Sequence, residues 1–239
     1  MSAGPDEIHH LIKQLGIVRD RAHDDQNAVL ILYSSVDPAH DARITAFSKF
    51  INVLNSVQLA FTFISKHLLY KQWWDAIAHT SISDSDKQVY ANEFANFTKV
   101  AFVQTLFSSI ESSLRLFLKA LDPSACNDGM AEFKSIYDCL FRSKLATSYP
   151  EGIVLLDLLR LVRNTIHNNG VYFDPQGRDV SLIWKGQTFD FKQTKPVDFV
   201  TWEFLIAASD SLREFLRKVV DDANLRSITQ EITDPFSHR

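Results

Sequence analysis

The residue types best suited to chemistry lie close together in one stretch of the chain: Arg160, Arg163, Asn164, His167 and Asn168. An imidazole exchanges protons near neutral pH, and a guanidinium stabilises negative charge on phosphate. Cleavage of RNA without a metal needs a base for the ribose 2′-hydroxyl, an acid for the leaving oxygen and cations for the phosphorane. We expect His167 to act as base or acid, with Arg163 and Arg160 as electrostatic clamps. Asn164 and Asn168 would position the substrate.

Other catalytic signatures are absent from the sequence. It has no glycine-rich phosphate loop, no His-Glu-x-x-His pair, no nucleophile elbow and no paired-cysteine zinc spacing. We therefore expect no metal and no cofactor. Cys126 and Cys139 are interpreted as free thiols in a reducing cytoplasm, because no basic and apolar signal segment opens the chain.

The motif stands at the end of an expected helix over residues 151–169. Four apolar residues form its stripe: Leu155, Leu159, Val162 and Ile166. With about 100° per residue, Arg163, His167 and Arg160 fall ~80°, ~120° and ~140° from the start of this stripe, beside it rather than opposite it. We therefore expect these three side chains on one face, at a boundary that another helix or a second protomer covers in part.

Arg163-Asn164 followed by His167, late on a helix of a helical chain, resembles the motif of HEPN domains. By resemblance, many members are metal-independent endoribonucleases in which Arg and His from two protomers face each other across a dimer groove. Others are non-catalytic binding modules. Three residues separate Arg163 from His167, fewer than the family usually has, and six separate Arg160 from it. Either arginine can therefore be the equivalent one.

The catalytic hypothesis also implies partners. One histidine per chain cannot serve as both acid and base, so the second must come from another chain. We expect a homodimer with the motif helix near a two-fold axis. Further expected partners are RNA and an antitoxin or regulatory protein, as in a phage-defence or toxin system.

A second charged pair, Glu111 and Arg115, is spaced four residues apart on an earlier expected helix. Related helical families place an acid–arginine pair here against the motif helix, so by resemblance the two residues would help to position the substrate. The alternative is an exposed ion pair on the helix surface, which contributes about a few tenths of a kcal/mol.

Two non-catalytic interpretations stand beside the enzymatic one. Basic residues and asparagines before Gly170 also make a good helix end, because they interact with the last carbonyls and lead into a left-handed cap. The motif could instead serve a helical interaction module that binds RNA, a nucleotide or a protein partner. The net charge of −4 and the pI near 6.0 favour the module, since an enzyme that cleaves RNA gains from a basic surface.

Composition predicts the framework that positions the motif. Only 7 Gly and 7 Pro occur in 239 residues, too few for the turns of a many-stranded β fold. We expect one mainly α domain over residues 1–239, an up-and-down helical bundle with a helical extension over residues 1–80. A small β-hairpin or meander over residues 171–191 is inserted before the last helix. No apolar run reaches the ~20 residues that span a bilayer.

Apolar periodicity sets the expected limits of the helices. The first expected helix runs from Pro5 to about Tyr33, and the second is one long helix that follows Pro38 and ends at Trp73 or Trp74. The other four run from Ser83 to Asp122, from Met130 to Leu145, over residues 151–169, and from Pro196 to about Asn224. The polar tail that follows is expected to be loose.

Overall fold

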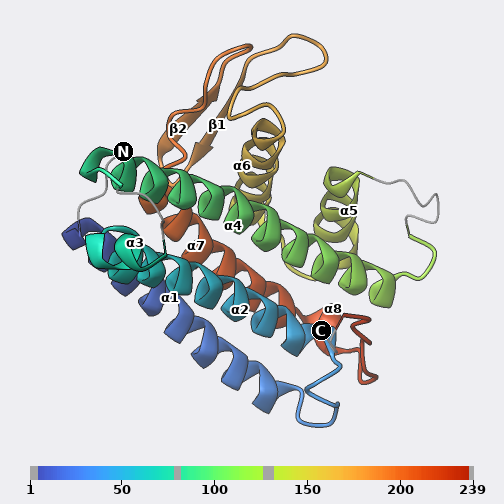
Figure 1. Ribbon diagram of the computed structural model, residues 1–239. Helices are drawn as coiled ribbons and strands as arrows, with labels where there is room; N and C mark the ends of the chain where they lie inside the picture. The colour runs from blue at the N-terminus through green and yellow to red at the C-terminus, as the bar shows by residue number, and fades with distance from the viewer. Residues whose placement is uncertain (1–4, 78–81, 126–131, 237–239) are drawn as a thin grey trace.

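A computed structural model describes residues 5–77, 82–125 and 132–236, and in them the chain is mainly helical with one small β-hairpin, as expected. Figure 1 shows the long helices packed together with the hairpin at one end of the bundle. In chain order the elements are α1 (Pro5–Leu32), α2 (Ala42–Phe63), the π-helix η1 (Ile64–Leu68), α3 (Lys71–Ile77), α4 (Asp84–Leu121), α5 (Phe133–Cys139), the π-helix η2 (Leu140–Lys144), α6 (Pro150–Ile166), β1 (Val180–Trp184), β2 (Gln187–Phe191), α7 (Trp202–Val220) and α8 (Ala223–Arg226).

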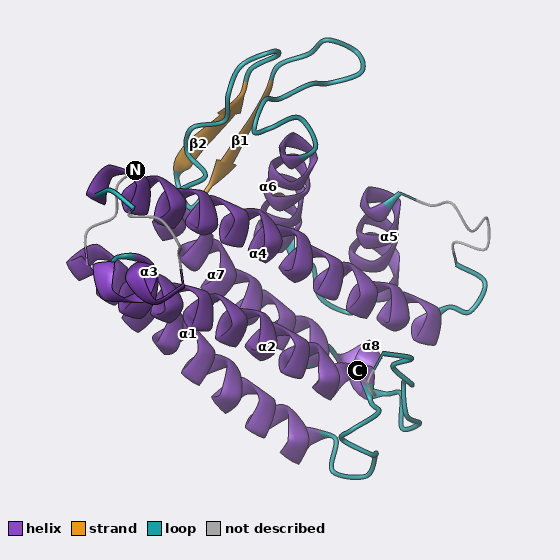
Figure 2. Ribbon diagram, in the orientation of Figure 1, coloured by secondary structure: helices purple, strands orange, loops and turns teal. Residues whose placement is uncertain are grey.

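The bundle is held by apolar side chains at helical spacing. Helix α2 lies between α1 and α4, and α7 packs against α1 (Figure 2). Several phenylalanines of α2 and α4 are almost fully buried: Phe47, Phe50, Phe61, Phe102 and Phe117. Burial of each such side chain contributes about 1.5–3 kcal/mol. The phenylalanine stripes are therefore core, as the sequence predicts.

The limits of α1 and α4 agree closely with the sequence. At the start of α4, the Ser83 hydroxyl accepts a hydrogen bond from the Asp86 backbone N–H, and the Asp86 carboxylate accepts one in return. This capping box satisfies two amide groups that a helix start otherwise leaves unpaired. The expected fourth helix is confirmed from Phe133 onward, but Met130 lies outside the described residues, as does Cys126. Cys139 is a free thiol.

The expectation of one long helix reaching Trp73 or Trp74 is wrong. The helix widens into the π-turn of η1, where the Leu69 backbone N–H donates to the Ile64 carbonyl over 3.3 Å, and a new short helix, α3, carries the tryptophans. The Trp74 indole donates to the Leu68 carbonyl over 2.8 Å and so satisfies the interrupted helix end. Apolar periodicity does not detect such a break, because the stripe continues through it.

The β segment is the hairpin, not the meander. Strands β1 and β2 pair antiparallel from Val180 with Phe191 to Trp184 with Gln187. Lys185 and Gly186 form the turn with φ values of 51° and 76°, the left-handed conformation that a two-residue hairpin turn requires. The expected first strand makes only an isolated bridge, between Val171 and Pro196.

That bridge also explains why the last long helix begins at Trp202 rather than at Pro196. The Val197 backbone N–H donates to the Gly170 carbonyl over 2.9 Å, which holds this segment out of the helix. The Phe199 ring then packs on the hairpin, and the Thr201 hydroxyl caps α7 by accepting from the Phe204 backbone N–H. The helix ends at Val220 and the short α8 follows.

The expectation of a loose tail is also wrong for its described part. The side chains of Asp41 and Arg43 are fully buried and pair with each other at 2.5 Å. Arg43 donates to the carbonyls of Ile228 and Gln230, and Asp41 accepts from the Ile232 backbone N–H. This ion pair at the start of α2 docks the tail onto the bundle.

Among the helices of the described residues, none combines the length and the apolar character that crossing a bilayer requires.

Candidate functional site

The candidate motif occupies the C-terminal end of α6. The helix ends at Ile166 rather than at Asn169, and His167 follows with helical angles of −65° and −15°. Asn169 and Gly170 then adopt left-handed φ values of 52° and 82°, and the Gly170 backbone N–H donates to the Thr165 carbonyl over 2.9 Å. The left-handed cap of the helix-end interpretation is therefore confirmed, whereas Arg163 donates to the Gln104 side chain and not to a carbonyl of the last turn.

Three polar residues of the motif face solvent: Asn164, His167 and Asn168. The His167 ring makes no hydrogen bond or ion pair with the described part of the chain. The sequence placed this histidine at a partly covered boundary, but the single chain leaves it open. Its proton-carrying atoms are consequently free to meet a substrate or a second chain.

Arg163 lies half-buried between α6 and α4. Its Nε donates to the Gln104 amide oxygen over 3.4 Å, and its guanidinium carbon lies 5.2 Å from the centre of the Phe107 ring. The aromatic face attracts the cation and fixes its position. The two Nη groups donate no hydrogen bond within the residues that the structure describes, so they remain available for an anion.

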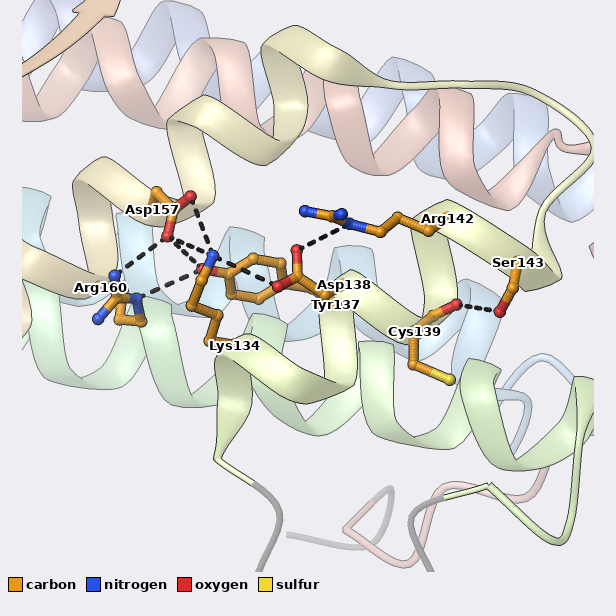
Figure 3. Close-up of polar contacts among 8 residues, drawn as sticks. All are labelled: Lys134, Tyr137, Asp138, Cys139, Arg142, Ser143, Asp157 and Arg160. Atoms are coloured by element: carbon orange, nitrogen blue, oxygen red, sulfur yellow. Dashed lines mark hydrogen bonds and ion pairs between the residues drawn. The ribbon is translucent and has the colours of Figure 1, made fainter.

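Arg160 points to a different set of partners on α5 and α6 (Figure 3). Its Nη2 donates to the Asp157 carboxylate over 3.1 Å, and its Nε donates to the Tyr137 hydroxyl over 3.3 Å. That hydroxyl in turn donates to Asp157 over 2.6 Å, and the Lys134 ammonium lies 3.3 Å from the same carboxylate. The four side chains form a network that joins α5 to α6, and Lys134 extends it to Asp138 at 3.4 Å.

The electrostatics of this network favour its charged form. Burial raises the pKa of Asp157, but the hydrogen bonds from Tyr137 and Arg160 and the charge of Lys134 outweigh burial and hold that pKa below its usual range. Burial and the same carboxylate raise the pKa of Tyr137, which stays neutral. Burial lowers the pKa of Arg160, but its two partners raise it above the ordinary value. Arg160 is thus committed to a structural ion pair.

Glu111 and Arg115 form the expected ion pair, with 2.6 Å between their closest atoms. Glu111 lies one helical turn after Phe107, so it is on the side of α4 that Arg163 contacts. The hydrogen bonds to Glu111 come from Arg115 of the same helix.

The seven candidate residues are therefore only partly brought together. Arg163, Asn164, His167 and Asn168 cluster at the end of α6, whereas Arg160 turns away from them. Sequence reasoning missed Gln104, Tyr137 and Asp157. Asp157 stands three residues before Arg160, and this spacing predicts an ion pair on one face of the helix. Gln104 and Tyr137 come from distant segments, so no local spacing predicts their contacts.

A metal centre has no support in the described segments, where no group of three or more His, Cys, Asp or Glu side chains could hold an ion. Comparisons of the chain with models of protein families, with curated proteins and with solved structures give no match. The candidate site therefore stands on its geometry.

The two arginines are expected to differ in their contribution to stability. Arg160→Met should lower the free energy of unfolding by about 1–3 kcal/mol, because Asp157 and Tyr137 lose a charged hydrogen-bond partner. Arg163→Met should lower it by about 1 kcal/mol at most, the scale of one cation–π contact. Urea unfolding of the two variants measures the difference, and equal losses would contradict the assignment of Arg160 to structure.

Proposed function

We propose that this chain is a metal-independent endoribonuclease in which His167 transfers the proton and Arg163 binds the scissile phosphate. The observation that carries the proposal is an open imidazole four residues from a guanidinium whose two Nη groups are free within the described residues, both at the end of α6. Helical spacing puts side chains at this separation about 5–6 Å apart at Cβ, a distance that one phosphate group bridges. Asn164 and Asn168 are exposed beside them and would hold the ribose and base.

Arg163, not Arg160, is the arginine that this proposal assigns to the phosphate. A phosphoryl group gains most from a cation whose hydrogen-bond donors are free and already positioned. The Nη groups of Arg163 meet both conditions, because Phe107 holds the guanidinium from one side. Arg160 would have to leave Asp157 first.

The proposed enzyme acts as a homodimer. General acid–base cleavage needs two proton-transfer groups, and each chain supplies one histidine at the motif. The exposure of His167 leaves room for the same residue of a second chain across a shared groove, which is the arrangement that the resemblance to HEPN domains implies.

The oligomeric state is a direct prediction. We expect light scattering to report a dimer at micromolar concentrations, and Asn164→Trp, within the motif, to shift it towards monomer. Asp20→Trp, exposed on α1, is the matched control and should leave the dimer intact. A wild-type monomer, or a dimer insensitive to Asn164→Trp, would contradict a shared motif groove.

The experiment that tests the activity is incubation of the purified protein with mixed RNA in EDTA. We expect fragments that end in a 2′,3′-cyclic phosphate, because the attacking group is the neighbouring 2′-hydroxyl. Cleavage that stops in EDTA and returns with Mg²⁺ would contradict the proposed mechanism.

One observation favours a second candidate, a non-catalytic module that binds RNA, a nucleotide or a protein partner such as an antitoxin in a phage-defence or toxin system. A catalytic base is commonly oriented by a third group, and the described residues give His167 no such hydrogen bond. RNA that binds to the dimer and stays intact would favour this module.

A further inference from the structure

A cavity of about 370 Å³ lies at the opposite end of α6 from the motif. The first turn of α6, the middle of α7 and the turn of the β-hairpin line it. Its volume falls in the range of ~300–1,000 Å³ that is typical of small-molecule sites. It shares no lining residue with the candidate nuclease site, so it calls for an explanation of its own.

The first turn of α6 lines this cavity. Tyr149 precedes the helix, and no side chain of the described residues caps it. Pro150 has no N–H, which leaves the backbone N–H groups of Glu151 and Gly152 at the positive end of the helix dipole. Such an end attracts anions.

Ser211 supplies a second, independent observation at this cavity. It lines the cavity from α7, its residue is 8% exposed, and its hydroxyl is buried with no hydrogen-bond partner in the described structure. Buried hydroxyls are normally hydrogen-bonded, because an unpaired one loses its bonds to water. Ser209, two residues earlier on α7, shows the ordinary case: its hydroxyl donates to the Leu205 carbonyl over 2.7 Å.

Four charged side chains line the cavity, two lysines and two glutamates. Lys185 in the hairpin turn and Lys218 on α7 line it, and neither forms an ion pair with any described residue. Glu214 also lines it, and its carboxylate lies 3.4 Å from Arg213, which pairs with Asp25 and Asp210 as well. Glu151 is the one lining carboxylate without an ion pair in the described residues.

The remaining wall is apolar and is formed by Leu155, Trp184 and Phe215. We propose that this cavity binds a phosphomonoester with a compact aromatic or apolar body. The phosphate accepts hydrogen bonds from the first turn of α6 and from Ser211 and lies between Lys185 and Lys218, while the body contacts the apolar wall.

Calorimetric titration of the full chain with phenyl phosphate, inorganic phosphate and neutral benzyl alcohol tests this proposal. We expect phenyl phosphate to bind most tightly, inorganic phosphate more weakly and benzyl alcohol not measurably. Ser211→Ala should weaken phenyl phosphate binding about 10-fold, the loss of one hydrogen bond to a charged group. Its melting temperature should stay unchanged or rise, because the free protein loses no hydrogen bond.

Ser209→Ala is the matched control, since it removes a buried hydroxyl that does not line the cavity, and its affinity for phenyl phosphate should equal that of the wild type.

Lys218→Gln should weaken binding and Glu151→Gln should strengthen it, because the first removes an attractive charge and the second a repulsive one. The opposite signs would show that the cavity prefers a cation. Equal affinity of the Ser211→Ala and wild-type proteins, or no binding of phenyl phosphate at millimolar concentration, would overturn the proposal. None of these measurements depends on RNA cleavage.

Discussion

Replacement of Arg43 by methionine is expected to lower the free energy of unfolding by about 3–5 kcal/mol. Both side chains of the Asp41–Arg43 pair are 0% exposed, so the substitution leaves a carboxylate in the interior without its cation. The two carbonyls that hold the tail to Arg43 lose their donor at the same time. The Arg43 guanidinium also lies 4.0 Å from the centre of the Tyr33 ring, and that contact disappears as well.

Urea unfolding measures this loss, and Lys71→Met supplies the control. Lys71 pairs with Asp75 at 2.7 Å, but their side chains are 57% and 49% exposed, and such surface pairs contribute about 0–1 kcal/mol. Limited proteolysis should in addition release the tail of Arg43→Met at lower protease concentration than that of the wild type. Equal stability losses in the two variants would show that the buried pair does not dock the tail.

The docked tail marks a limit of sequence reasoning. Asp41 and Ile232 are far apart in the chain, and nothing in the polar segment after α8 signals a partner at the start of α2. Helix propensity correctly predicts no helix in this tail. It cannot predict that backbone groups of the tail form hydrogen bonds with the buried side chains of Asp41 and Arg43.

Helices with strong local signals were predictable because their determinants are local. The capping box at Ser83 and the regular apolar spacing of α4 define that helix without tertiary information. The start of α7 was misplaced because the chain around Val197 is held by a hydrogen bond to Gly170, which only the folded chain brings near. Helix breaks by π-turns were likewise invisible to periodicity.

In the candidate site, too, local features are predictable from the sequence and contacts between distant segments are not. Helical geometry predicts the common face of Arg163 and His167, since both belong to one helix. It cannot predict that Tyr137, from another helix, helps to turn Arg160 towards Asp157. The face of a helix on which a side chain lies follows from the sequence. The hydrogen-bond partners of that side chain depend on which helix packs against it.

The largest expected functional effect concerns His167. If the proposed function holds, His167→Ala should reduce the rate of RNA cleavage by about 10²-fold or more, the contribution of one acid–base group. His23→Ala, an exposed histidine on α1, is the matched control and should cleave at the wild-type rate. The free energy of unfolding should stay within about 0.5 kcal/mol, because the His167 side chain is exposed and makes no described contact.

Arg163 adds the charge-stabilising half of the same prediction. Arg163→Ala should reduce the rate of RNA cleavage by about 10²-fold or more, which is the effect of removing one preorganised hydrogen-bond donor from a developing charge. The loss should appear in kcat, because the charge on the phosphate is greatest in the transition state. Arg163→Lys keeps the charge but not the paired Nη donors, so it should recover only part of the rate. Single-turnover rates of the wild type and of the four variants decide the outcome. Full activity in His167→Ala would assign cleavage to another site, whereas unchanged RNA binding without cleavage in every protein, the wild type included, would leave the motif as a binding surface.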